Sequence, residues 1–317
     1  MKNKLRKAFL FLTSPLTLAS AIWMKFVRSK GSSPFSDFLF MKVGVFPILD
    51  HYYEPMINPG KYLERPLTED RTLAAIDLNE KGQLSLLNDF QYAEELKAFP
   101  LHKENKASYY YFNDSYGPGD SEYLYQMIRH FQPKKLIEIG SGNSTLMAQN
   151  AIRKNQQSNP SYQCKHSCIE PFEQPWLEEL GIEVSRERVE KIDLSVFKSL
   201  EENDILFIDS SHIIRPQGDV LHEYLTILPL LKPGVLIHIH DIFTPKDYPE
   251  KWVIENHHFW NEQYLLEAFL SFNGSFEIIG ALNYLKHHHF DALAAQCPVL
   301  GQFPFSEPGA FWMKKLK

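Results

Sequence analysis

The sequence predicts an α/β protein built on a mostly parallel, doubly wound sheet, and three observations lead to this fold class. From Lys134 onward, short apolar runs rich in β-branched residues alternate with segments whose apolar residues recur at helical spacing. The first of these runs turns into a helix through two glycines, Gly140 and Gly142. Two later runs end in acidic residues, at the sheet edge where ligands bind in doubly wound folds.

Length and composition narrow the class of protein further. The 317 residues are enough for one large domain with appendages, or for two small domains. A net charge of −6 argues against a broad nucleic-acid-binding surface. The three cysteines form neither a disulfide framework nor a CxxC motif, which fits a reducing compartment.

Residues 1–30 differ in character from the rest of the chain. Lys and Arg flank an apolar stretch, Ala8 to Met24, that is short for a spanning helix and is interrupted at Ser14-Pro15. We expect this segment to lie on, or be anchored in, the inner face of a membrane, with the rest of the protein cytoplasmic. A cleaved signal peptide is the alternative, because Ala19-Ser20-Ala21 resembles a signal-peptidase site.

Residues 31–105 show no clean period, because prolines interrupt them repeatedly, and residues 106–317 form the predicted main domain. Short helices are expected at 68–76 and 84–96. We interpret this stretch as a helical and aromatic cap over the mouth of the main domain, although a purely structural extension explains it equally well.

The first strand carries the most informative motif. Leu136, Ile137 and Ile139 form a buried parallel strand, and the helix expected at 143–152 follows the glycines directly. Such a turn lets a ligand approach backbone N–H groups at the positive end of the helix dipole. Glu138 is a carboxylate inside this apolar strand, and burying it is costly unless it is paired. We therefore expect it to face a cationic or hydroxyl-bearing ligand in a nucleotide-type site.

The remaining elements follow in an alternating order. Asp120 is expected to cap the helix at 121–131, or else to touch the cofactor, and Asp193 to cap the helix at 194–200 rather than to approach an adenine. Glu170 ends the second strand, where an acid can accept both ribose hydroxyls. Further strands are expected at 182–185, 204–209 and 235–241, with helices at 176–180, 218–231 and 262–272. Strands at 276–282 and 310–314 complete the sheet.

Polar side chains gather at the ends of two neighbouring strands. Asp209 ends the fourth strand, and His240 and Asp241 end the fifth, so that parallel geometry brings them together. Two carboxylates and an imidazole can hold a divalent ion, which lowers the pKa of a bound hydroxyl. His212, three residues after Asp209, is the candidate for accepting the proton, although a surface-loop histidine is nearly as good an interpretation.

Other histidines and aromatic residues have simpler explanations. His238 alternates into the packed face of its strand and is expected to be a hydrogen-bonded core residue. His287, His288 and His289 are consecutive on a predicted helix and point apart, so we expect no metal site there. Trp252, His257 and Trp260 can stack on a sugar or a cofactor, or can simply pack as part of a lid.

The motif Glu138-x-Gly140-x-Gly142 resembles motif I of class I S-adenosylmethionine-dependent methyltransferases; Thr145 stands where a dinucleotide fingerprint has its third glycine. The resemblance implies a Rossmann-like, seven-stranded sheet whose last two strands are antiparallel, and places Glu138 against the methionine amino group.

Residues 207–212 and 235–243 are similar to the sugar O-methyltransferases and cephalosporin-hydroxylase-like proteins. In that family, positions matching Asp209 and His212 supply a metal ligand and the base. Positions matching His240 and Asp241 supply further ligands, although His240 stands where the family usually has Glu.

These observations lead to one functional expectation with two rivals. The expected enzyme transfers a methyl group from S-adenosylmethionine to a hydroxyl of a sugar or glycan acceptor, assisted by Mg²⁺ or another divalent ion. Glu138, Gly140, Gly142, Glu170 and, less directly, Asp120 would hold the cofactor. An NAD-dependent oxidoreductase and a non-catalytic, membrane-tethered scaffold remain alternatives. The sequence leaves open whether the protein forms homo-oligomers.

Overall fold

The computed structural model describes residues 2–29, 33–51, 53–104, 108–172 and 176–317, which fall into two compact units, Met1–Pro66 and Leu67–Lys317. The sequence-based division into a membrane-proximal segment (1–30), a cap (31–105) and a main domain (106–317) stays a prediction.

The first unit consists of helices and connecting loops. Its helices are α1 (Lys2–Leu12), α2 (Ser14–Ser29), α3 (Pro34–Val43) and α4 (Pro59–Tyr62). Within the described residues, no single helix is long and apolar enough to cross a membrane, whereas the bent pair Asn3–Leu12 and Ser14–Ser29 has sufficient length and composition. Lys30, part of the predicted membrane segment, lies outside the described residues.

The second unit is organised around a seven-stranded sheet with the order β3-β2-β1-β4-β5-β7-β6. Its strands are β1 (Lys135–Ile139), β2 (Lys165–Ile169), β3 (Glu183–Ser185), β4 (Ile205–Ile208), β5 (Leu236–Ile239), β6 (Phe276–Ala281) and β7 (Phe311–Lys315). The first five strands are parallel, and β7 runs antiparallel to both β5 and β6. The predicted fold class, including the antiparallel final pair, is confirmed.

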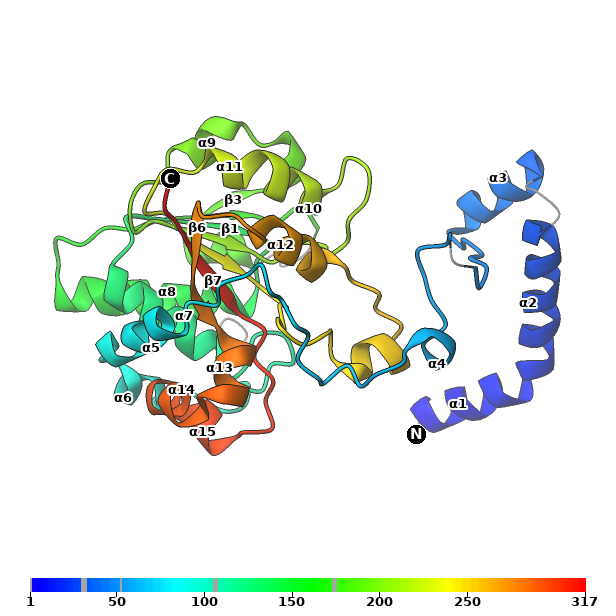
Figure 1. Ribbon diagram of the computed structural model, residues 1–317, viewed down its shortest axis with the longest axis horizontal. Coiled ribbons are helices and arrows are strands. Elements are labelled where there is room, and N and C mark those ends of the chain that lie inside the picture. The colour runs from blue at the N-terminus through cyan, green and yellow to red at the C-terminus, as the bar shows by residue number, and fades with distance from the viewer. Residues whose placement is uncertain (1, 30–32, 52, 105–107, 173–175) are drawn as a thin grey trace. The chain divides into compact units, whose positions relative to one another are not determined.

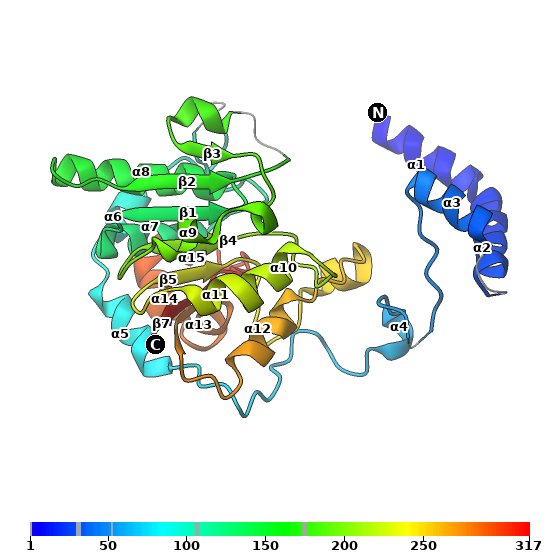
Figure 2. The ribbon, with the colours of Figure 1, turned by 90° about the horizontal axis from the view of Figure 1, so that it is seen from above.

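Helices cover both faces of this sheet (Figures 1 and 2). One layer contains α5 (Glu80–Asp89), α6 (Ala93–Leu96), α7 (Asp120–Phe131), α8 (Asn143–Ser158), α13 (Leu282–His288), α14 (Phe290–Gln296) and α15 (Pro298–Gln302). The opposite layer contains α9 (Leu194–Lys198), α10 (Asp219–His222), α11 (Leu228–Leu230) and α12 (Glu262–Leu270). Short turns lie at Leu177–Leu180 and Val189–Lys191, and wider, π-helical turns at Glu223–Ile227 and Lys251–Glu255. The chain is therefore wound on both sides of the sheet.

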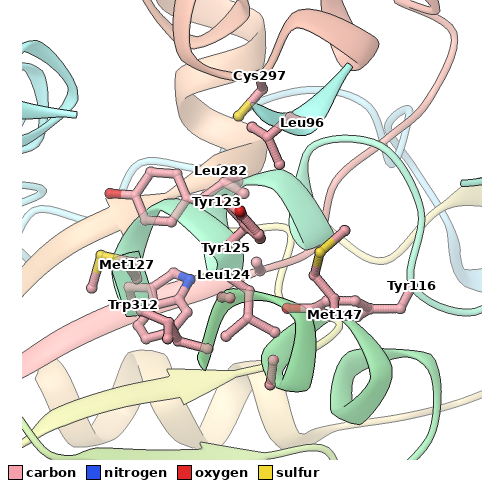
Figure 3. Close-up of a cluster of buried hydrophobic side chains, with 14 of the residues drawn as sticks. Leu96, Tyr116, Tyr123, Leu124, Tyr125, Met127, Met147, Leu282, Cys297 and Trp312 are labelled. Atoms are coloured by element: carbon pink, nitrogen blue, oxygen red, sulfur yellow. The ribbon is translucent and has the colours of Figure 1, made fainter. Parts of the chain in front are cut away.

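Helix α7 is the most deeply buried helix of the first layer. Tyr123, Leu124, Met127 and Ile128 are inaccessible to solvent and pack with Trp312 of β7, as Figure 3 shows for the labelled members of this cluster. The Tyr123 hydroxyl donates to the Ile279 carbonyl of β6 at 2.7 Å. This packing holds the loop before α7 against the end of the sheet that carries the candidate site.

Several boundaries differ from the prediction for physical reasons. No helix forms at 68–76, because this segment bonds outward: the Arg71 N–H donates to the Pro245 carbonyl and its guanidinium pairs with Glu267 and Asp247. The helix expected at 84–96 is divided into α5 and α6, and α8 continues six residues beyond 152, to Ser158. The expected helix at 218–231 forms, with a π-helical turn before Pro229, which has no N–H to donate.

Of two predictions about helix-capping side chains, the structure confirms one and corrects the other. Asp193 caps α9 as expected, accepting from the Ser195 N–H at 2.8 Å. Asp120 is not the N-cap of α7, since Gly119 occupies that position and the Asp120 carboxylate accepts from the Ala310 N–H instead. The conformation of Gly119 (φ +90°) frees Asp120 to bond to the C-terminal strand region.

Replacing Glu122 with Gln should destabilise the fold. The buried Glu122 carboxylate accepts from the N–H groups of Gly119, Val299 and Leu300 at 2.7–3.0 Å, using both oxygens. Because an amide offers only one acceptor oxygen, at least one buried N–H loses its partner in Glu122→Gln. We expect the free energy of unfolding in urea to fall by about 1–3 kcal/mol.

The control is Glu94→Gln on α6, where the Glu94 side chain is 85% exposed. This substitution should change the unfolding free energy by less than about 0.5 kcal/mol. Equal stability of the two variants would show that the Glu122 carboxylate does not join α7 to α15.

Candidate active site

The glycine turn after β1 is fixed by contact with the end of β4. The Gly140 N–H donates to the Ile169 carbonyl at 3.0 Å, and the Asp209 N–H donates to the Ile139 carbonyl at 2.8 Å. Gly140 has φ +82°, and a Cβ there would lie 2.0 Å from the Asp209 carbonyl oxygen. A Cβ at Gly142 would meet nothing within 4 Å. Gly140 thus permits the close approach of two strand ends, while Gly142 faces open space at the start of α8.

A cavity of about 530 Å³ opens beside this turn. It is lined by residues that include Gly140, Glu170, Asp209 and Arg188, so that three of the predicted site residues share one wall. Glu170 accepts from the Ser141 N–H at 3.2 Å and from the Phe172 N–H at 3.0 Å. These bonds hold the Glu170 carboxylate at the end of β2, directly beside the glycine turn.

Glu138 lies behind the turn and does not line this cavity. Its carboxylate is fully buried and is hydrogen-bonded by the Thr145 hydroxyl of α8, with Cys168 and His166 of β2 on its other side. Among the described residues none bonds to its second oxygen, Oε1. One Glu138 oxygen is therefore held by the protein, and the other is buried without a partner.

Three more of the described residues carry buried polar atoms without a partner: Tyr116 in the loop before α7, Ser141 in the glycine turn and His240 after β5. Within the described part of the chain, the Tyr116 hydroxyl, the Ser141 hydroxyl and His240 Nδ1 are buried without a hydrogen-bond partner. The Tyr116 and His240 rings lie 5.0 Å apart, and His240 Nε2 lies 3.3 Å from the Ser115 carbonyl oxygen. Because unsatisfied buried polar groups are rare, these atoms fit a region in which a polar ligand supplies the missing partners.

The ends of β4 and β5 bring together Asp209, His212 and Asp241, as the parallel register requires. One potential ligand atom from each lies within 4.8 Å of the others. His212 Nε2 is 3.3 Å from Asp209 and 3.6 Å from Asp241, and His212 Nδ1 is 2.8 Å from the buried carboxylate of Glu262. His240 is not part of this set; its Nε2 lies 3.4 Å from the Asp241 carboxylate. Three carboxylates thus converge on one imidazole.

The backbone at this cluster is held in an uncommon conformation. His212 and Asp241 have φ values of +59° and +57°, in the left-handed region that non-glycine residues rarely adopt. Such strain persists where surrounding contacts impose it, and it is concentrated at functional sites. Here the Trp260 ring covers His212 at 4.4 Å, and the Asn261 and Glu262 N–H groups donate to the His212 carbonyl oxygen.

Charge and burial shift the ionisation of these groups in opposite directions. Burial lowers the pKa of His212, but hydrogen bonds to Asp209 and Glu262 outweigh it and hold that pKa well above the usual range. Burial raises the pKa of Asp209, yet His240 and His212 bring it below its ordinary value. Burial raises the pKa of Asp120 to about 6 despite the nearby His240. Carboxylates outnumber imidazoles at this edge of the sheet, which favours the approach of a cation over that of an anion.

Sequence reasoning missed Glu262, the residue that orients His212. An acid in the first turn of a helix is ordinary, and nothing in the sequence marks Glu262 as fully buried against a histidine 50 residues earlier. His238 is buried as predicted, but the prediction that it is hydrogen-bonded is wrong. Among the described residues neither ring nitrogen has a partner, and the ring stacks on Phe207 at 4.1 Å.

Comparison with known proteins agrees with this arrangement. A methyltransferase domain family matches residues 137–242, from β1 to just beyond β5. An uncharacterized protein from Archaeoglobus fulgidus is 30% identical over 168 residues, covering 49% of this chain and 74% of the relative.

Among solved structures, an O-methyltransferase from Bacillus cereus in complex with S-adenosylhomocysteine is 14% identical. The match covers 74% of this chain and 91% of that chain, with a TM-score of 0.35. The MycE methyltransferase of the mycinamycin biosynthetic pathway, in complex with Mg and S-adenosylhomocysteine, is 16% identical. That match covers 74% and 55% of the two chains, with a TM-score of 0.32.

The chain contains a methyltransferase domain at residues 137–242, and its strand order is the one that the resemblance to class I S-adenosylmethionine-dependent methyltransferases implies. It shares a family with the Archaeoglobus protein. The glycine turn, the acid at the end of β2 and the acidic ends of β4 and β5 all lie within the segment that the methyltransferase domain model matches.

Replacing Gly140 with Ala should destabilise the contact between the ends of β1 and β4. The added methyl group would collide with the Asp209 carbonyl oxygen, and alanine at φ +82° is strained. We expect the unfolding free energy to fall by about 2 kcal/mol or more. The measurement is urea unfolding followed by circular dichroism.

The matched control is Gly274→Ala, where a Cβ meets nothing within 4 Å and φ lies outside the left-handed region. It should unfold at the same urea concentration as the unmodified chain. If Gly140→Ala were equally stable, the contact between the ends of β1 and β4 would not be the constraint described above.

Proposed function

We propose that this methyltransferase transfers the methyl group of S-adenosylmethionine to a hydroxyl group of a sugar or glycan, with a divalent ion at the ends of β4 and β5. The observation that carries the proposal is the convergence of Asp209, His212 and Asp241 beside the cavity that contains Gly140 and Glu170. A nucleoside site and a cation site then share Asp209 as their border.

In this proposal the cofactor is held by the residues around the glycine turn. Glu170, at the end of β2, accepts the ribose hydroxyls, and Gly140 and Gly142 give the ligand access to the start of α8. Glu138 Oε1 and the Tyr116 hydroxyl supply unpartnered polar atoms for the amino-acid end of the cofactor. Asp120 is buried nearby and contributes negative charge around His240.

The acidic strand ends fit a divalent cation by their chemistry. Asp209 and Asp241 supply carboxylate oxygens, which hard cations prefer, and His240 flanks Asp241 at 3.4 Å. Bound S-adenosylmethionine supplies the electrophilic methyl group, and a divalent ion at these residues lowers the pKa of the acceptor hydroxyl.

His212 is proposed as the base. Glu262 accepts the Nδ1 proton and fixes the ring, so that Nε2 faces the ends of both strands. A cation held by Asp209 and Asp241 would neutralise the carboxylates that raise the pKa of His212, so that Nε2 would be free to receive the proton of the acceptor hydroxyl. As the new O–C bond forms, the bond between the methyl carbon and sulfur breaks, leaving a methyl ether and S-adenosylhomocysteine. Trp260 over the His212 ring limits the access of water.

A sugar acceptor is supported by the aromatic side chains beside His212. Trp260 contacts His212, and Trp252 lies 5.1 Å from Trp260 in the insertion between β5 and α12. A flat aromatic face suits the C–H face of a sugar ring, while vicinal hydroxyls suit a cation held by carboxylates.

Glu170→Gln should weaken cofactor binding selectively. Loss of the charged acceptor for the ribose hydroxyls is expected to raise the dissociation constant of S-adenosylhomocysteine by about 10-fold or more, measured by calorimetry. Glu183→Gln on the neighbouring strand β3, where the side chain is 64% exposed, is the control and should bind normally. Binding of reduced nicotinamide cofactor in place of S-adenosylhomocysteine would instead favour an oxidoreductase.

Asp209→Asn and His212→Gln should distinguish a residue that binds the cation from a residue that acts as the base. Mn²⁺ binding, followed by electron paramagnetic resonance, should weaken about 10-fold or more in Asp209→Asn, because a charged ligand is lost. It should persist in His212→Gln, because His212 acts on the proton. Loss of Mn²⁺ binding in His212→Gln would make this imidazole a metal ligand and contradict its assignment as the base.

We also propose that residues 1–30 bind an anionic lipid surface at the inner face of a membrane. This segment contains Lys and Arg but no Asp or Glu, in a chain with a net charge of −6. Many of its apolar side chains are exposed, among them Phe9 at 65%, Phe11 at 78% and Trp23 at 63%. Exposed aromatic residues combined with one sign of charge are typical of a segment that lies in a lipid interface.

The test is co-sedimentation of the full chain with vesicles containing phosphatidylglycerol. Replacing Lys4, Arg6 and Lys7 with Gln should weaken binding about 10-fold or more, since each cation contributes about 1 kcal/mol near such a surface. The control replaces two exposed lysines of the second unit, Lys97 and Lys191, and should sediment normally. Equal binding to neutral and anionic vesicles would contradict the electrostatic part of the proposal.

A further inference from the structure

A second set of potential metal ligands lies beneath the glycine turn, separate from the acidic strand ends. It consists of Glu138 on β1 with His166 and Cys168 on β2. The parallel register places Glu138 opposite Cys168, and His166 lies two residues earlier on the same face of β2. All three side chains are buried, with exposed fractions of 0%, 5% and 1%. Residues on two paired strands are held rigidly, which favours a preorganised site.

The distances between the three ligand atoms suit one tetrahedral ion. Glu138 Oε2 is 3.4 Å from His166 Nε2 and 3.3 Å from Cys168 Sγ, and the His166 and Cys168 atoms are 3.8 Å apart. An ion with zinc–oxygen and zinc–nitrogen bonds of about 2.0 Å and a zinc–sulfur bond of about 2.3 Å requires tetrahedral edges of roughly 3.3–3.5 Å. Two of the three observed distances fall in this range and the third exceeds it slightly.

The surroundings of the cluster also fit a zinc-type ion. Carboxylate, thiolate and neutral imidazole carry a formal charge of −2, which a divalent ion neutralises in a site without solvent. Gln149 Nε2 lies 2.6 Å from His166 Nδ1. Turning the Gln149 amide over would bring its oxygen to that position, where it would accept the Nδ1 proton and leave His166 Nε2 as a lone-pair donor toward the cluster, the arrangement common at zinc histidines.

The protein surface also offers an ion a path to this cluster. A surface hollow of about 390 Å³, lined by residues that include Gln149, His166 and Gly181, reaches the cluster from outside and offers an entry path.

We propose that Glu138, His166 and Cys168 form a binding site for Zn²⁺ or a similar thiophilic divalent ion. On binding, the Cys168 sulfur loses its proton to solvent and forms the metal–sulfur bond, with no change in oxidation state. The ion clamps β2 to β1 immediately below the glycine turn. Glu138 would bind the ion through Oε2, so that Oε1 is not a ligand of this ion. The site does not require that the protein transfer methyl groups.

The experiment uses Co²⁺ as a spectroscopic substitute for Zn²⁺ on the metal-free full chain. Cobalt bound to a thiolate gives a charge-transfer band in the near ultraviolet, which cobalt on oxygen and nitrogen ligands does not. We expect the band to saturate at one thiolate-bound Co²⁺ per chain, apart from any Co²⁺ held by Asp209 and Asp241, and to be lost when Zn²⁺ displaces that ion. The band should be unchanged in Asp209→Asn, which alters the other cation site.

Cys168→Ser tests the assignment to this cysteine, because serine keeps the hydrogen-bond donor to Glu138 but is a poor zinc ligand. The band should disappear and Zn²⁺ should bind about 10-fold or more weakly, as also expected for His166→Gln. Cys164→Ser, which changes a half-buried cysteine outside the cluster, should behave like the unmodified chain.

Two outcomes would overturn the proposal. One is cobalt binding by the unmodified chain without a thiolate band, which would leave the cluster as a hydrogen-bonded network of Glu138, His166 and Cys168. The other is a band that survives in folded Cys168→Ser. If Cys168→Ser did not fold, the spectrum of the unmodified chain, together with that of Cys164→Ser, would decide the matter.

Discussion

The close contact between the ends of β1 and β4 is the constraint on which the site depends. Asp209 bonds through its N–H to Ile139, while Gly140 bends away with its Cα against the Asp209 carbonyl oxygen. The next ladder bond, from the His240 N–H to the Ile208 carbonyl, fixes the end of β5 in the same way. Three strands therefore end at one edge, where β1 continues into Gly140 and the other two strands place Asp209, His240 and Asp241. A parallel register, not a shared loop, brings residues 70 to 100 positions apart into one site.

Negative charge at this edge creates an electrostatic imbalance that the protein only partly compensates. Asp209, Asp241 and Glu262 surround His212, and the positive φ values at His212 and Asp241 show that the backbone is held against its preference. A cation at this edge would relieve the repulsion among these carboxylates. This combination of strain and unbalanced charge distinguishes the site from the structural ion pairs of the same unit, such as Arg71 with Glu267.

The sequence predicted the elements whose signals are local. The apolar runs identify β1, β4 and β5, the glycines locate the turn, and the acids at strand ends indicate where the site lies. It did not predict features set by distant contacts. The segment at 68–76 lacks a helix because its partners lie beyond residue 240, and Glu262 becomes important only when α12 packs against the end of β4. Asp120 bonds to Ala310, nearly two hundred residues later.

The partners of Glu138 illustrate the same distinction. A carboxylate within an apolar strand signals a special environment in the sequence, and the structure supplies one in Thr145, His166 and Cys168. His166 and Cys168 lie beside Glu138 because of the register of β2 against β1, and no local sequence pattern encodes that register.

The most direct test of the central claim is a crystal structure of the protein grown with S-adenosylhomocysteine and Mn²⁺, with anomalous scattering to locate the ion. We predict the nucleoside in the cavity between Gly140 and Glu170, and an anomalous peak bound by Asp209 and Asp241. Nucleoside density outside that cavity, or an ion bound away from these two carboxylates, would contradict the account.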